Sequence, residues 1–281
     1  MLNPNLIKIK SKELDIPYEN LLMGCILEET VKFVSSNYKE ELWVINDSAL
    51  GLASYKRSLN DTLILSYSGS EEMEDFVRKL SMSIVSYYMN LDIKVATEFL
   101  SQSTVCFRLD ILKMRIPFVL VVQKTGELNT FPREKTLMLT LENAKAIHYM
   151  EYPLEERISE LVFDILDKLE LLNEMNSYID LYDILKTETV EGRKVKECLS
   201  GKCEKKSGFD MKRFEVLRSY GDYAYMKKKW KRAVRQAKRD ELEWSEVHEL
   251  IIKFTEPIYK AMLSDDLFFG DWIPEIGRFL D

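Results

Sequence analysis

Apolar residues in the first half of the chain recur with two different periods, one typical of helices and one typical of strands. The helical period predicts two helices, and we expect Ser70 to cap the second, which has acidic residues in its first turn. Short apolar runs rich in β-branched residues predict strands. The predicted elements are a helix over 19–37, strands over 42–46 and 62–68, a helix after Ser70, and four strand-like runs between residues 91 and 141.

The pattern changes near residue 150. From Leu154 onward the apolar spacing is helical almost to the end of the chain, except in the polar stretch 186–208, which predicts a mobile loop or a short helix with a linker. We therefore expect an α+β fold, with a mixed sheet and flanking helices in residues 1–150 and a helical domain in residues 151–281. Two such domains suit a cleft that holds a ligand between them.

Composition excludes several classes of protein. The chain has 281 residues, 46% of them hydrophobic, so it is not disordered as a whole, and its net charge is −7. Only 10 glycines are present and no glycine-rich phosphate loop is visible, and two histidines leave little for a histidine-based catalytic triad. The four cysteines are scattered, no apolar run spans a bilayer, and no secretory signal is visible. We expect a cytoplasmic protein without a membrane partner.

Two features of the helical half are candidates for chemistry. Lys168 falls into the apolar stripe of its helix, so its ammonium either reaches the edge of the stripe or points into a cleft to meet an anion such as nucleotide phosphate. Asp180 and Asp183 are three residues apart and share a helix face. Together they either hold a metal or polarise a ligand hydroxyl, or they form a first-turn acidic pair favoured by the helix dipole.

Polar residues also separate the two predicted strands of the first half. Asp47 or Ser48 can cap a helix that begins near Ala49, and the N–H groups at such a terminus bind phosphate, although a plain capped turn has the same pattern. Asp61 begins the second strand. Metal-dependent phosphoryl transfer usually needs two carboxylates, and the position two residues further on is Leu63.

Four short motifs follow one another in a recognisable order: "NDSAL" (46–50), Arg57 with Asp61, "ILDKL" (165–169) and "IDLYDIL" (179–185). With this order and spacing, the chain resembles the abortive-infection nucleotidyltransferase toxins of the AbiEii and AbiGii type, in the DNA polymerase beta-like nucleotidyltransferase superfamily. The resemblance spans about residues 10 to 190. Its most specific part is "DLYDIL" after a lysine-bearing helix.

The resemblance implies an enzyme that uses Mg²⁺ and transfers a nucleoside monophosphate from a nucleoside triphosphate to an RNA or protein acceptor. It also implies an antitoxin or other partner protein. Carried over to this sequence, it implies that Asp61 is a catalytic and metal-binding carboxylate and that Asp180 completes the catalytic site. It further implies that Ser48, Arg57 and Lys168 bind the nucleotide.

The chain departs from the family pattern at several of these positions. The small turn residues, the second acid and the arginine before the last aspartate are replaced by Asn46 and Asp47, Leu63, and Ile179. Loss of the second carboxylate removes most two-metal catalysis unless Asp110 or Glu127, on later strands, replaces it. The chain is therefore an active nucleotidyltransferase, a degenerate one that binds a nucleotide, RNA or protein, or an unrelated two-domain binding protein.

The last feature is the stretch 226–239, "MKKKWKRAVRQAKR", in which eight of fourteen residues are basic. On a helix, Trp230 and Val234 lie on a short apolar seam, and the cations cover the remaining surface. Such a helix in an acidic protein is either a nucleic-acid contact, for example with the backbone of a structured RNA, or a solvated helix balanced by the acidic run 240–249. The candidate contacts are Lys228, Lys231, Arg232 and Arg235.

Overall fold

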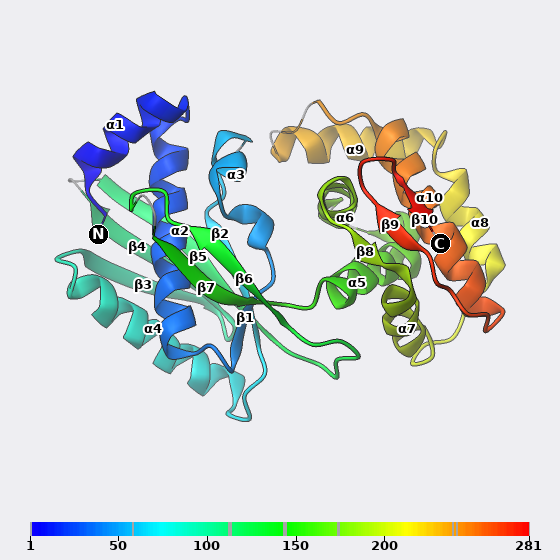
Figure 1. Cartoon of the computed structure of the whole chain (residues 1–281), viewed down its shortest axis with the longest axis horizontal. Helices are drawn as coiled ribbons and strands as arrows, with labels where there is room; N and C mark the ends of the chain where they lie inside the picture. The colour runs from blue at the N-terminus through cyan, green and yellow to red at the C-terminus, as the bar shows by residue number, and fades with distance from the viewer. Residues whose placement is uncertain are drawn as a thin grey trace. The chain divides into compact units, whose positions relative to one another are not determined.

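The computed structural model divides into two compact units, and the chain passes from one to the other after Tyr152, close to the boundary predicted from the sequence (Figure 1). The N-terminal unit comprises Met1–Glu127 and Pro132–Tyr152, and the C-terminal unit comprises Leu128–Phe131 and Pro153–Asp281. The predicted class, a mixed sheet with flanking helices followed by a helical region, is confirmed. The structure describes residues 2–57, 59–111, 114–142, 145–172, 175–237, 239 and 241–280.

The N-terminal unit is built on a seven-stranded sheet of order β3-β4-β5-β2-β1-β7-β6. The pairs β2–β5 and β1–β7 are parallel, and the other neighbouring pairs are antiparallel. Strand β7 was not predicted from the sequence. The strands are β1 (Leu42–Val44), β2 (Thr62–Tyr67), β3 (Lys94–Ser101), β4 (Thr104–Ile111), β5 (Met114–Lys124), β6 (Arg133–Met138) and β7 (Ala146–Glu151).

Helices α2 and α4 supply most of the helical part of this unit's core. Helix α2 contacts β1, β7 and α4, and α4 also contacts β3. The apolar stripe predicted for α4 is buried, but Ser70 does not cap this helix, because α4 begins at Met73 after Glu72 and has no side-chain cap. The helices are α1 (Pro4–Leu14), α2 (Tyr18–Asn37), the 3₁₀ helix η1 (Asp47–Ala49), α3 (Leu52–Arg57) and α4 (Met73–Met89).

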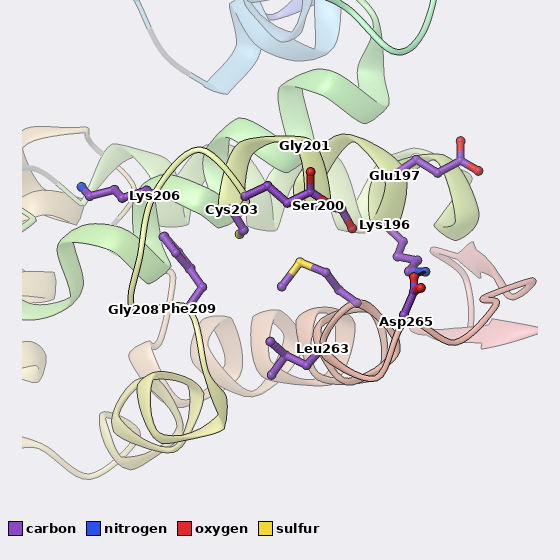
Figure 2. Close-up of a pocket in the computed structure, with 12 residues that line it drawn as sticks. Lys196, Glu197, Ser200, Gly201, Cys203, Lys206, Gly208, Phe209, Leu263 and Asp265 are labelled. Carbon is purple, nitrogen blue, oxygen red and sulfur yellow. Dashed lines mark ion pairs between the residues drawn. The ribbon is translucent and has the colours of Figure 1, made fainter.

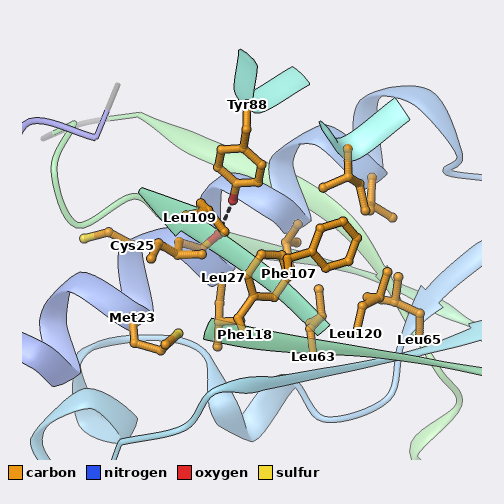
Figure 3. Close-up of a cluster of buried hydrophobic side chains, with 14 of the residues drawn as sticks. Met23, Cys25, Leu27, Leu63, Leu65, Tyr88, Phe107, Leu109, Phe118 and Leu120 are labelled. Carbon is orange, nitrogen blue, oxygen red and sulfur yellow. Dashed lines mark hydrogen bonds between the residues drawn. The ribbon is translucent and has the colours of Figure 1, made fainter. Parts of the chain in front are cut away.

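The core of this unit combines apolar side chains from α2, α4 and alternate positions of the central strands (Figure 3). Leu63 and Leu65 are fully buried on β2, and Leu63 pairs in register with Leu120 of β5. Helix α3 packs closely on α2, since a Cβ atom at Gly24 would lie 2.5 Å from the ring of Tyr55. Glycine is therefore required where these helices meet.

The C-terminal unit is a helical cluster with a small three-stranded sheet of order β10-β9-β8, which the sequence analysis did not predict. The polar stretch 186–208 contains a helix of twelve residues, α7, in which Val195 and Leu199 are buried. Within the described residues, no helix combines the length and apolar character that a membrane span requires. The elements are α5 (Leu154–Lys168), η2 (Leu169–Leu171), α6 (Asn176–Thr187), β8 (Val190–Glu191), α7 (Gly192–Cys203), α8 (Met211–Ser219), α9 (Ala224–Gln236), α10 (Trp244–Leu263), β9 (Asp271–Ile273) and β10 (Arg278–Leu280).

Candidate functional site

The turn after β1 is tied to the start of β2 by one side chain. The amide of Asn46 donates to the carbonyl of Thr62 at 2.8 Å and accepts from the backbone N–H of Ile64 at 2.8 Å. These two side-chain hydrogen bonds take the place of backbone hydrogen bonds where the β1–β2 ladder ends. The turn itself is the 3₁₀ helix η1 with Asn46 at its cap position, so neither Asp47 nor Ser48 caps an α-helix as predicted.

The predicted nucleotide-binding residues of this turn are exposed. Ser48 lies in η1, and its hydroxyl makes no hydrogen bond to any described residue. Arg57 is the last residue of α3, and its guanidinium donates to the carbonyl of Ala53 one turn earlier. Since α3 has only six residues and the N–H groups of Ala49 and Leu50 are used within η1, this segment has no free helix terminus suited to phosphate.

Asp61 and Leu63 lie in different environments although they are close in sequence. The carboxylate of Asp61 is exposed just before β2 and accepts a hydrogen bond from the Thr62 hydroxyl at 3.1 Å. Leu63 is buried in the core (Figure 3). A carboxylate at position 63 would therefore lie among apolar side chains rather than beside an ion that exchanges with solvent.

Neither of the suggested replacement acids lies beside Asp61. Asp110 of β4 is opposite Arg115 and pairs with it at 3.3 Å, whereas the β5 residue level with the start of β2 is Val119. Glu127 follows β5 at the end of the sheet where β2 finishes. Among the residues with assigned positions, no three of the types His, Cys, Asp and Glu come together as metal ligands. The surroundings of Asp61 do not fit a two-metal site, and we derive no transfer step from them.

A partly buried charge cluster, centred on the buried Glu151 and not predicted from the sequence, occupies the neighbouring part of the sheet. The ammonium of Lys135 on β6 lies 2.6 Å from Asp47 Oδ2 and 2.8 Å from Glu151 Oε1. The Glu151 side chain is only 4% exposed, and its Oε2, 3.5 Å from the Arg133 guanidinium, makes no hydrogen bond to the described residues. Lys135 therefore holds two carboxylates together.

The protonation of this cluster follows from its burial. Burial, and then the nearby charge of Asp47, raises the pKa of Glu151 to about 7, and Lys135 and Arg133 oppose that rise. The pKa of Lys135 is raised because its two carboxylate partners outweigh its burial. Asp47 is thus neutralised by Lys135.

In the C-terminal unit, Lys168 is the last residue of α5 and its side chain is 52% exposed. It pairs with Asp164 one turn earlier, and Asp164 also accepts a hydrogen bond from the Ser177 hydroxyl at 2.8 Å. The ammonium is therefore bound on its own helix at the edge of the apolar stripe.

The two aspartates of α6 are each paired with an arginine. Asp180 accepts a hydrogen bond from Arg157 at 3.0 Å, and Asp183 forms a bidentate ion pair with Arg239 at 2.8 and 3.1 Å. Both acids lie beyond the first turn of α6, which contains no acidic residue, so the helix-dipole interpretation is wrong. These pairs join α6 to α5 and to the segment after α9, and sequence spacing alone does not indicate them.

The basic helix α9 presents a row of free cations. Met226, Trp230 and Val234 form its buried seam, and the indole N–H of Trp230 donates to the carbonyl of Leu242 at 2.8 Å. On the opposite side are four exposed cations that make no ion pair or hydrogen bond with any described residue: Lys228, Lys231, Arg232 and Arg235. We call these four side chains the α9 basic face. Lys238, in the same basic stretch, lies outside the described residues.

No described carboxylate of the acidic run 240–249 forms an ion pair with the α9 basic face. Glu241 pairs with Arg239, and Glu246 pairs with Lys186 and accepts from the Tyr182 hydroxyl. The carboxylates of this run that form ion pairs are therefore bound to other cations, and the interpretation of α9 as a helix balanced by that run is not supported.

A pocket of about 720 Å³ in the same unit contains none of the predicted site residues. It is bounded by α7, the segment after α7 and the end of α10, with Cys203, Phe209 and Leu263 among its apolar lining (Figure 2). Lys196 at its rim faces Asp265 at 3.7 Å. Its rim carries both lysines and acids, so charge alone selects no class of ligand.

Comparison with known proteins identifies no family. No protein-family model matches the chain, and no curated protein matches it. Among solved structures, the chain is similar to the crystal structure of JHP933 from Helicobacter pylori, with 10% sequence identity and a TM-score of 0.46. The similarity covers 89% of this chain and 96% of that one.

Proposed function

We propose that this chain is an RNA-binding protein whose interface is the α9 basic face and whose N-terminal unit is a nucleotidyltransferase-like unit that has lost two-metal catalysis. The observation that carries the proposal is the set of four exposed cations on one side of α9, none of them paired with a described residue. The chain as a whole has a net charge of −7, so this concentration of positive charge does not reflect a generally basic surface.

The chemistry of the α9 basic face favours a polyanion. Four neighbouring cations repel one another, and a row of phosphates relieves that repulsion while it releases the counterions condensed on the nucleic acid. Arginine at two of the four positions adds planar donors that match phosphate oxygens. The buried seam of Trp230 and Val234 fixes the helix to its unit, so the four side chains are presented from a rigid element.

The N-terminal unit supports the second part of the proposal. A two-metal site needs a carboxylate pair, and here Asp61 is exposed while the position of its partner is Leu63 in the core. Asp47 is bound by Lys135. We therefore expect no transfer of a nucleoside monophosphate by this chain to RNA or protein.

RNA binding is tested by fluorescence anisotropy with a labelled RNA over a range of salt concentrations. Alanine at Lys228, Lys231, Arg232 and Arg235 should weaken binding and lower the slope of log K against log salt by roughly 3, since each phosphate contact on a single strand contributes about 0.7. The matched control replaces four exposed lysines elsewhere that form no ion pair with a described residue: Lys8, Lys12, Lys56 and Lys94. If the two quadruple variants lose affinity equally, α9 is not the interface.

Loss of catalysis is tested separately by incubating the chain with each labelled nucleoside triphosphate, Mg²⁺, and total RNA or protein as acceptor. We expect no label transfer. Transfer that disappears in Asp61→Ala would show that one carboxylate suffices and would overturn the second part of the proposal.

A further inference from the structure

Two exposed tyrosines stand at the start of α9, beside its basic face. Tyr223 is the residue before the helix and is 43% exposed, and Tyr225 is the second residue of the helix and is 52% exposed. Neither hydroxyl forms a hydrogen bond with a residue in the described part of the chain. Both rings therefore present a large aromatic surface to solvent without a polar partner that would explain their position.

These rings form a row that begins in the core. Tyr220 is buried, and its ring stacks on that of Tyr223 with centroids 5.7 Å apart and planes inclined by 28°. The ring of Tyr223 lies next to that of Tyr225 at 5.9 Å, inclined by 44°. Because each ring restrains its neighbour, a ligand that stacks on the row orders few additional side-chain rotations.

The row is continuous with the cations. Tyr225, Lys228 and Arg232 are spaced by three and four residues, so they follow one another along a single stripe of the helix. The ammonium of Lys229 lies over the Tyr225 ring, 5.7 Å from its centroid, and this cation–π contact adds a further positive charge at the row. A strand whose phosphates follow this stripe brings its bases next to Tyr225.

We propose that the interface selects single-stranded RNA, because unpaired bases stack on Tyr223 and Tyr225 while the phosphates bind the α9 basic face. This inference rests on the proposed function and adds its specificity. In a duplex the faces of the bases are already stacked on one another, so the tyrosines have nothing to bind and only the phosphate contacts remain. A single strand offers unpaired bases to the tyrosines and phosphates to the α9 basic face.

The test compares a labelled, unstructured single-stranded RNA with the same RNA annealed to its complement, using the full chain and anisotropy at one salt concentration. Tyr225→Ala should weaken binding of the single strand roughly 5- to 150-fold, the range that loss of base stacking gives, and should leave duplex binding unchanged. Tyr225→Phe keeps the ring and should retain affinity for the single strand. Arg232→Ala should weaken binding of both RNAs.

Different results overturn the two proposals. If neither RNA binds, or if both quadruple variants bind as the unmodified chain does, the proposed function fails. If both RNAs bind with equal affinity, or if Tyr225→Ala binds the single strand like the unmodified chain, RNA binding stands but the selection of single strands by the tyrosines is wrong. Circular dichroism of each variant checks that α9 is folded, and Tyr225 is exposed, so its replacement removes little packing.

Discussion

The ammonium nitrogen of Lys135 lies 2.8 Å from the Oε1 atom of Glu151, a carboxylate that is almost completely buried. The two residues stand on adjacent antiparallel strands, and Lys135 reaches from β6 to a second carboxylate, Asp47, at 2.6 Å. A cation shared by two carboxylates neutralises a pair that would otherwise repel. The cluster thus joins η1 to the edge of the sheet.

Replacing the shared cation should destabilise the N-terminal unit. Lys135→Met leaves Glu151 buried beside Asp47 without its main counter-charge, and we expect a loss of about 3 kcal/mol in the free energy of unfolding. Hydrogen exchange of peptides from β6 and β7 measures the loss in this unit alone. The matched control is Lys39→Met. It removes an exposed ion pair with Glu134, which lies on β6 next to Lys135, and should change the free energy of unfolding little. If Lys135→Met and Lys39→Met lower the stability equally, the burial of Glu151 does not add to the stabilisation by its ion pair.

Much of the fold follows from local pattern. Helix α2 was predicted because apolar residues recur along its length, and the structure buries most of it. Strand β7 was missed, although Ile147 and Tyr149 flank the polar His148 with the period-two spacing of a half-buried strand. The stretch that contains α7 was predicted as a mobile loop or a short helix with a linker, because its many charged residues outnumber the two apolar residues, Val195 and Leu199, that anchor the helix.

The partners of the ion pairs could not be predicted from local sequence pattern, because they are distant in the sequence. Asp47 and Lys135 are 88 residues apart, and only the pairing of β1 with β7 and of β7 with β6 brings them together. Asp180 was identified, but Arg157 was not. The α9 basic face was predicted by residue number because it depends on helical periodicity within one segment, which a single sequence contains.

The stability of the N-terminal unit should depend on the protonation of Glu151. Its pKa is raised by burial to about 7, so the folded state binds this proton more tightly than the unfolded state. The contribution is therefore fully present below the ordinary carboxyl pKa and is lost as the pH rises through 7. We expect a loss of at most about 3 kcal/mol over this window, with Asp47, Lys135 and Arg133 as the other charged groups of the cluster.

Glu151→Gln tests this, because the amide has nearly the same shape and does not titrate. Chemical unfolding of the N-terminal unit at several pH values between 5 and 8, followed by hydrogen exchange, should show a flatter pH dependence for the variant. If the free energy of unfolding changes with pH equally in the variant and in the unmodified chain, Glu151 keeps one protonation state throughout this range.

A second acid placed two residues after Asp61 should not create a metal site. Leu63→Asp places a carboxyl group in the core beside Leu120, and we expect a loss of roughly 4 kcal/mol or more without any gain in label transfer. Ile64→Asp, on the half-buried opposite face of β2, is the matched control and should be tolerated better. Denaturant unfolding measures both. A stable Leu63→Asp variant that binds Mg²⁺ would show that this face of β2 is open.

The C-terminal unit should respond to pH in the opposite direction, through His248. Burial lowers the pKa of this histidine, whose Nε2 lies 3.0 Å from the carbonyl of Leu217. The unfolded chain takes up the proton first as the pH falls, so stability is present above about pH 6.5 and is lost below it. Tryptophan fluorescence in a Trp43→Phe background reports on this unit, which contains the other three tryptophans.

His248→Gln should flatten the fall in melting temperature between pH 7.5 and 5.5, whereas His148→Gln, at an exposed position on β7, should leave it unchanged. A steep fall that persists in His248→Gln would assign the pH dependence to other groups.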